Sequence, residues 1–168
     1  EKDFKTAISY AEKIKNKDLS LYYISLCYEN MTGYYHNKVY INQEAENKEY
    51  KDSLLYYLDK SHETIKQVKD NNGVVSNDFK YEHIAFTYIR LGIFYLEQSE
   101  LEQSEKHLLE GYKIHENKEY NIPVYSKIIL LNQPSLLYLE KEEYQKSIDF
   151  AQRALKLEKK NNNPYGRV

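Results

Sequence analysis

Tryptophan is absent from this 168-residue sequence, and cysteine, proline and glycine are scarce, with one, three and five residues. The single cysteine, Cys27, excludes an internal disulfide, and its apolar neighbours favour a small buried side chain. No apolar run approaches the roughly 20 residues that a membrane-spanning helix needs. So few prolines and glycines leave long stretches in which helices can form without interruption.

An excess of charge of one sign is also lacking, since the net charge is −2 and the two signs are interspersed. Binding to a phosphate backbone requires concentrated Lys and Arg, so we expect no direct contact with nucleic acid, and none with a membrane. The chain begins without an initiator Met or a signal-peptide pattern, which favours a fragment of a longer protein. The bias towards Lys, Asn, Ile and Tyr indicates an AT-rich bacterial genome, and we favour the cytoplasm over the periplasm.

Apolar residues recur at three- and four-residue steps along most of the chain, which is typical of amphipathic helices. Sustained strand-like alternation is nearly absent. Gly73 can end one helix and Ser76 can cap the next, while Ser99 and Glu102 have the spacing of a capping box. The sequence therefore predicts seven helices, mostly antiparallel neighbours, at roughly 2–16, 18–35, 49–70, 79–97, 100–117, 124–140 and 142–160.

A pattern of small and apolar residues marks the middle of the chain. Residues 88–95 read YIRLGIFY, and residues 104–108 read SEKHL. A glycine in mid-helix, such as Gly92, costs about 1 kcal/mol relative to Ala, and close packing against another helix would offset that cost. These residues resemble the tetratricopeptide repeat, with its pattern W-x2-L-G-x2-Y followed by A-x3-F. In that family a side chain at Gly92 or Ser104 would push the two helices of a repeat apart.

The resemblance extends over most of the chain and divides it into repeats. The best match is the repeat from about 85 to 118. The expected units are the second helix of a truncated repeat at 1–17, a repeat with an insertion at 18–70, repeats at 79–118 and 124–160, and a tail at 161–168. In the repeat with the insertion, Ser53 and Leu54 fit the pattern of a second helix, after about 16 extra residues.

Two features depart from the repeat pattern. Pro134 and Ser135 stand where Leu and Gly are expected, and a proline removes a helical hydrogen bond to the Leu130 carbonyl. We therefore predict a kink or a restart of the helix at Pro134, and we favour a packing bend over a role in binding. The insertion near 36–48 is either a pair of longer helices or a loop. We favour partial helix extension with a polar loop near 42–47.

The resemblance implies an all-α, right-handed superhelical solenoid of stacked antiparallel helix pairs, whose first helices line a concave groove. Such a groove would bind a protein or peptide partner, and a homodimer is left open. Arg90 is expected to hold a carboxylate, and Asn30, Asn132 and Gln133 to bond a peptide backbone. The alternative is that the apolar members contact a neighbouring turn or an adjoining domain. The predicted groove residues are Tyr22, Leu26, Asn30, Phe86, Ile89, Arg90, Ile93, Glu97, Ile129, Asn132, Gln133 and Leu136.

The sequence contains no recognisable arrangement of catalytic or metal-binding residues. Its five histidines lack a ligand spacing such as H-E-x-x-H, so we expect them to be solvated helix residues. A glycine-rich phosphate loop, a nucleophile elbow and a calcium loop are also missing. We therefore expect no catalysis, no cofactor and no metal ion.

Two functions remain under consideration. Tyr95 and Tyr138 are 43 residues apart, which exceeds the usual repeat of about 34. Arrays with this longer spacing resemble those coupled to helix-turn-helix regulators or histidine kinases. The first hypothesis is therefore the sensor or regulatory part of a larger bacterial signalling protein or transcriptional regulator. The alternative is a constitutive scaffold for a protein complex, and a hydrolase or transferase is disfavoured.

Overall fold

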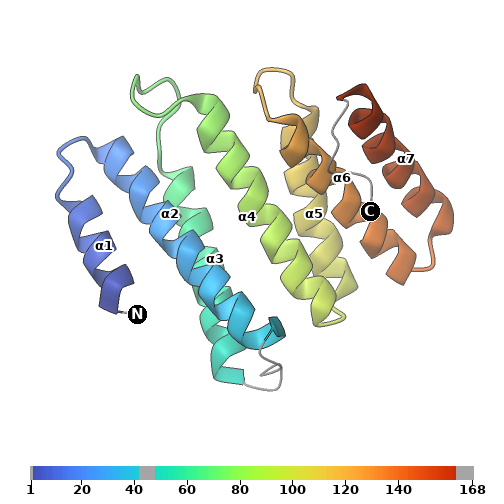
Figure 1. Ribbon diagram of the computed structural model, residues 1–168, viewed down its shortest axis with the longest axis horizontal. Coiled ribbons are helices and arrows are strands. Elements are labelled where there is room, and N and C mark those ends of the chain that lie inside the picture. Colours follow the sequence, from blue (N-terminus) through green and yellow to red (C-terminus); the bar gives the residue numbers. More distant parts are fainter. Residues whose placement is uncertain (1, 42–47, 162–168) are drawn as a thin grey trace. The chain divides into compact units, whose positions relative to one another are not determined.

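Helices account for nearly all of the regular structure (Figure 1). The computed structural model describes residues 2–41 and 48–161. Those two ranges contain seven α-helices, one π-helical turn and no strand, which confirms the all-α prediction. The elements are α1 (Lys2–Glu12), α2 (Lys17–His36), η1 (Asn37–Ile41), α3 (Lys48–Lys66), α4 (Asn77–Glu97), α5 (Leu101–Glu116), α6 (Val124–Glu140) and α7 (Tyr144–Lys160).

Most helix boundaries agree with the signals in the sequence, but the start of α5 does not. The Ser76 hydroxyl accepts a hydrogen bond from the Phe79 N–H at 3.2 Å, as expected of a cap for α4. Ser99 has a φ of +60°, and the Glu100 N–H donates to the Tyr95 carbonyl at 2.9 Å. Ser99 therefore closes α4 in the left-handed conformation. The predicted capping box is wrong, since no side chain caps α5.

The chain divides into two compact units, residues 1–87 and 88–168, and the boundary falls inside α4. In the first unit α2 packs against both α1 and α3. In the second unit α6 packs against both α5 and α7. A cluster that α5, α6 and α7 share forms a core of the second unit. Its buried members are Leu131, Tyr138, Phe150 and Ala154, and Leu109, Tyr112 and Leu157 pack against them.

The insertion lengthens the first complete helix pair. Helix α2 reaches His36 and continues as η1, and α3 begins at Lys48, so the predicted partial helix extension is confirmed. The expected polar loop at 42–47 lies outside the described residues. Tyr35 of α2 stacks on Tyr57 of α3, with ring centroids 5.5 Å apart and planes 13° apart. Aromatic contacts of this kind pack the added turns of α2 and α3 against each other.

A small residue on the first helix and a serine on the second mark the close approach of two later pairs. The Ser104 hydroxyl donates to the Gly92 carbonyl at 2.8 Å, across 12 residues. The Ser147 hydroxyl donates to the Ser135 carbonyl at 2.8 Å, again across 12 residues. The two donors are 43 residues apart, as are the two acceptors. One side-chain contact therefore recurs in register, as an internal repeat requires.

Ser61, rather than Ser53, takes this place in the pair formed by α2 and α3. The Ser61 hydroxyl donates to the Ser25 carbonyl at 3.0 Å, across 36 residues instead of 12. Ser61 is buried, whereas Ser53 is only half-buried. The assignment of Ser53 to the repeat pattern is therefore wrong. A separation of 36 residues instead of 12 means that the insertion is longer than the roughly 16 residues expected. All of the extra residues lie between Ser25 and Ser61.

Gly92 lies at a point where no side chain fits. A Cβ placed there would be 2.5 Å from the Leu108 Cγ and 3.3 Å from the Leu108 backbone nitrogen. Atoms cannot approach so closely without displacement of Leu108, which is fully buried. The prediction that Gly92 permits close packing of two helices is confirmed.

Candidate binding surfaces

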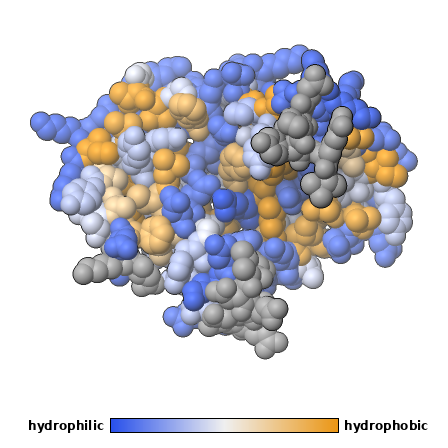
Figure 2. Space-filling model, in the orientation of Figure 1, coloured by the Kyte–Doolittle hydropathy of each residue, from blue (hydrophilic) through white to orange (hydrophobic). Residues whose placement is uncertain are grey.

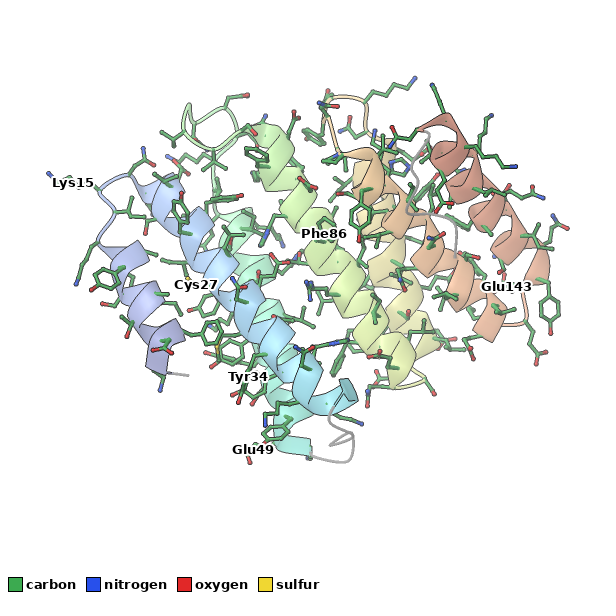
Figure 3. All side chains as sticks on the ribbon, in the orientation of Figure 1. Lys15, Cys27, Tyr34, Glu49, Phe86 and Glu143 are labelled. Atoms are coloured by element: carbon green, nitrogen blue, oxygen red, sulfur yellow. The ribbon has the colours of Figure 1, made fainter. Side chains whose placement is uncertain are left out.

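Three predicted groove residues of the first unit share one face of α2. Tyr22, Leu26 and Asn30 follow at steps of four, and their side chains are half-buried or exposed. The Asn30 side-chain N–H₂ donates to the Leu26 carbonyl at 2.9 Å, so part of its hydrogen-bonding capacity is used within the helix. Burial, followed by the nearby Glu82 carboxylate, raises the pKa of the Tyr22 hydroxyl. Phe86 of α4 is also half-buried (Figure 3).

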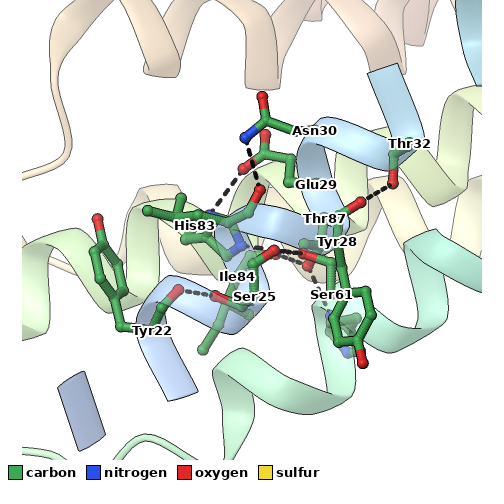
Figure 4. A network of polar contacts seen from close by, with 12 residues as sticks. Tyr22, Ser25, Tyr28, Glu29, Asn30, Thr32, Ser61, His83, Ile84 and Thr87 are labelled. Atoms are coloured by element: carbon green, nitrogen blue, oxygen red, sulfur yellow. Dashed lines mark hydrogen bonds and ion pairs between the residues drawn. The ribbon is translucent and has the colours of Figure 1, made fainter. Parts of the chain in front are cut away.

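A buried polar network connects α2, α3 and α4 within the first unit (Figure 4). His83 Nε2 lies 3.2 Å from the Ser61 hydroxyl, and His83 Nδ1 lies 3.1 Å from a Glu29 carboxylate oxygen. His62 Nδ1 lies 2.8 Å from the Thr87 hydroxyl. His62 and His83 are 7% and 6% exposed, so the expectation of solvated histidines is wrong for both.

The hydrogen-bond donors of this network fix one ring tautomer. The Ser61 hydroxyl gives its hydrogen to the Ser25 carbonyl, so it can only accept from His83. His83 therefore carries a hydrogen on Nε2, and its Nδ1 faces a Glu29 carboxylate oxygen at 3.1 Å. Ser25, Ser61 and His83 are buried among packed helices, and Glu29 is half-buried. The network therefore links α2, α3 and α4 through their side chains.

In the second unit, the later part of α4 contributes four predicted groove residues. Arg90 and Ile93 are half-buried and Glu97 is exposed, all on one side of the helix. Ile89 is 2% exposed and therefore belongs to the packed side of α4. A ligand cannot reach Ile89 without displacing its neighbours, so its assignment to a groove surface is corrected.

Helix α6 carries four of the predicted groove positions. Leu136 is 49% exposed, Asn132 is exposed, and Ile129 and Gln133 are half-buried. The four residues lie at helical spacing on the side of α6 that faces away from the buried Leu131, Pro134 and Tyr138. Apolar groups thus reach the surface of α6 among polar ones. Hydrophobic and hydrophilic residues are also interspersed over the face of the molecule viewed in Figure 2. This side of α6 offers apolar contact and amide hydrogen bonding together.

Pro134 is part of the packed side of α6. It is buried, and α6 continues through it from Val124 to Glu140, so the helix does not restart there. Its missing N–H leaves the Leu130 carbonyl without the usual helical donor. The burial of Pro134 agrees with a packing role rather than with direct ligand contact.

The Glu105 carboxylate of α5 accepts hydrogen bonds from α6 and from the residue that follows it. The Tyr138 hydroxyl donates to one Glu105 oxygen at 2.8 Å, and the Lys141 ammonium donates to the other. The hydrogen bond from Lys141 holds the pKa of Glu105 below its usual value, and burial raises the pKa of Tyr138. The Lys146 ammonium lies 4.9 Å from the centre of the Tyr138 ring. All four groups take part in contacts between neighbouring helices or at helix ends.

The described residues contain no group of three or more His, Cys, Asp or Glu side chains that could hold a metal ion. None of the helices in that part of the chain is long and apolar enough to cross a membrane. No family model, curated protein or solved structure matches this chain.

Proposed function

We propose that this chain is a non-catalytic module that binds a protein or peptide on the open faces of its first helices. In this proposal it is the sensor or regulatory part of a larger bacterial signalling protein or transcriptional regulator, as its resemblance to tetratricopeptide repeats implies. The main support is the hydrogen bond that recurs at 43 residues, from Ser104 to Gly92 and from Ser147 to Ser135. Helix pairs that pack through the same contact leave equivalent helix faces open for binding.

The open side of α6 has the chemistry that a polypeptide requires. Leu136 and Ile129 offer apolar surface on either side of the exposed Asn132. The Asn132 amide can both accept from a peptide N–H and donate to a peptide carbonyl. Arg90 and Glu97 add charges of both signs on α4 of the same unit. Such a surface favours a ligand with apolar side chains and accessible backbone over a small polar metabolite.

The proposal is tested by selecting peptides from a displayed library and measuring their dissociation constants by fluorescence anisotropy. Asn132→Ala and Leu136→Ala should each weaken the selected peptide about tenfold, as expected for residues near the centre of an interface. Gln145→Ala, at an exposed position of α7, is the control and should leave the affinity unchanged. Failure to select any peptide would contradict the function. A selected peptide that tolerates both α6 variants would contradict the assigned surface.

A further inference from the structure

One side of α7 carries a row of apolar side chains that the described residues of the second unit, 88–161, leave exposed. Tyr144, Ile148 and Leu155 are 58%, 48% and 48% exposed, and Ala151 between them is also exposed. Their spacing of four, three and four residues places them on one side of the helix. These four residues are called the α7 row. Other residues of α7 pack into the core of the unit, so the α7 row is a second apolar side of the same helix.

The internal repeat shows what covers the corresponding row on α5. Counting back 43 residues, Ile148 corresponds to Glu105 and Leu155 corresponds to Tyr112. Glu105 accepts a hydrogen bond from Tyr138 of α6, and Tyr112 packs against the cluster formed with α6 and α7. Both α5 side chains are therefore partly covered by the helix pair that follows them. Ile148 and Leu155 occupy the same surface one repeat later, without that cover in the described residues.

We propose that the α7 row is a docking site for one amphipathic α-helix, which lies against α7 as α6 lies against α5. The site is separate from the open side of α6 and does not depend on the peptide-binding function. The arrangement of α5 and α6 supplies the template for the orientation and register of the docked helix. A helix is favoured over an extended segment because the equivalent surface in this chain is covered by helices.

One difference between the two rows specifies the chemistry of the docked helix. Glu105 accepts from both the Tyr138 hydroxyl and the Lys141 ammonium, whereas Ile148 has no acceptor at the equivalent place. A hydroxyl or an ammonium buried against Ile148 would lose water without gaining a partner, which is unfavourable. The docked helix therefore carries apolar residues at the positions equivalent to Tyr138 and Lys141.

Two synthetic peptides test this register directly. The first has the sequence of residues 122–141 with Tyr138→Leu and Lys141→Leu, and the second has the same residues unaltered. Fluorescence anisotropy with the whole chain should show saturable binding of the substituted peptide. The unaltered peptide should bind at least tenfold more weakly, because its hydroxyl and ammonium would face Ile148. Equal binding of the two peptides, or no binding of the substituted one, would overturn the proposal.

A matched pair of protein variants locates the site. Ile148→Lys should weaken the substituted peptide at least tenfold, whereas Gln145→Lys adds the same charge at an exposed position outside the α7 row and should have little effect. Circular dichroism checks that both variants keep their helix content. Sedimentation of the chain alone tests whether a second copy of the chain, rather than a separate helix, covers the α7 row. A concentration-dependent dimer that Ile148→Lys abolishes would assign the α7 row to a second copy of the chain and overturn docking of a separate helix.

Discussion

Replacement of Gly92 by alanine tests the close helix crossing most simply. Alanine is favoured over glycine in a helix by about 1 kcal/mol, so an open site would become more stable. At Gly92, however, the new Cβ would lie 2.5 Å from both the Cγ and Cδ2 of Leu108. The contact of 3.3 Å with the Leu108 backbone nitrogen limits how far that residue can retreat.

The two opposing effects can be compared in magnitude. A methyl group forced into a packed core costs about 1–3 kcal/mol, and two clashes with a buried leucine place Gly92→Ala in the upper part of that range. After the gain in helix propensity, the free energy of unfolding should fall by about 1–2 kcal/mol. Chemical unfolding followed by circular dichroism measures this loss.

A double-mutant cycle identifies Leu108 as the cause. The α6–α7 pair has Ser135 and Ala151 where α4 and α5 have Gly92 and Leu108. Gly92→Ser combined with Leu108→Ala should therefore lose less stability than the two single variants added together, by about 1–2 kcal/mol. Additive losses would show that the two sites do not interact.

Gly33→Ala is the matched control for the single variant. Gly33 is also helical, but a Cβ there would meet nothing within 4 Å. Gly33→Ala should stabilise the chain by about 0.5–1 kcal/mol. If Gly92→Ala stabilised the chain as Gly33→Ala does, the proposed reason for the glycine would be refuted.

Three further variants test single contacts. Ser147→Ala leaves the Ser135 carbonyl without its side-chain donor and should lower the free energy of unfolding by about 1 kcal/mol in a urea titration. The pKa of Glu105 is lower in the folded chain, so this residue stabilises the fold above its unfolded pKa near 4.5, and the stabilisation is lost as pH falls through the folded pKa. Glu105→Gln should therefore lower the free energy of unfolding at pH 7 and change it little at low pH. Burial lowers the pKa of His107, so its protonation favours the unfolded state as pH falls below about 6.5. His107→Phe keeps an aromatic ring against Tyr95 and should make the melting temperature less dependent on pH between 7.5 and 5.5; an unchanged pH dependence would contradict the role of His107.

Local spacing was sufficient to predict that Gly92 and Ser104 lie where two helices cross closely. Gly92 and Ser104 belong to one short helical hairpin, and the spacing between them is preserved in Ser135 and Ser147. Both pairs are joined by a short turn, so the sequence distance between partners is constant. The seven helices were predictable for a similar reason, because each has its own apolar periodicity.

The contacts that the sequence did not predict depend on longer separations or on competing local signals. Ser53 and Ser61 both precede apolar residues of α3. Because the length of the insertion is not evident from the sequence, the sequence does not show which of the two serines bonds to α2. His83 meets Glu29 across 54 positions of sequence, so no local motif contains the pair. Ser99 has a good capping spacing, but its positive φ completes the end of α4 instead.

The most direct test of the proposed binding role is methyl NMR with isoleucine labels and a selected peptide. Ile93 and Ile129 lie on the open sides of α4 and α6. Ile65 is buried within the first unit and Ile128 is buried within the second. The account predicts saturable shifts of the Ile93 and Ile129 methyl signals, with much smaller changes at Ile65 and Ile128. Saturable binding that leaves both Ile93 and Ile129 unperturbed would contradict binding on the first-helix faces.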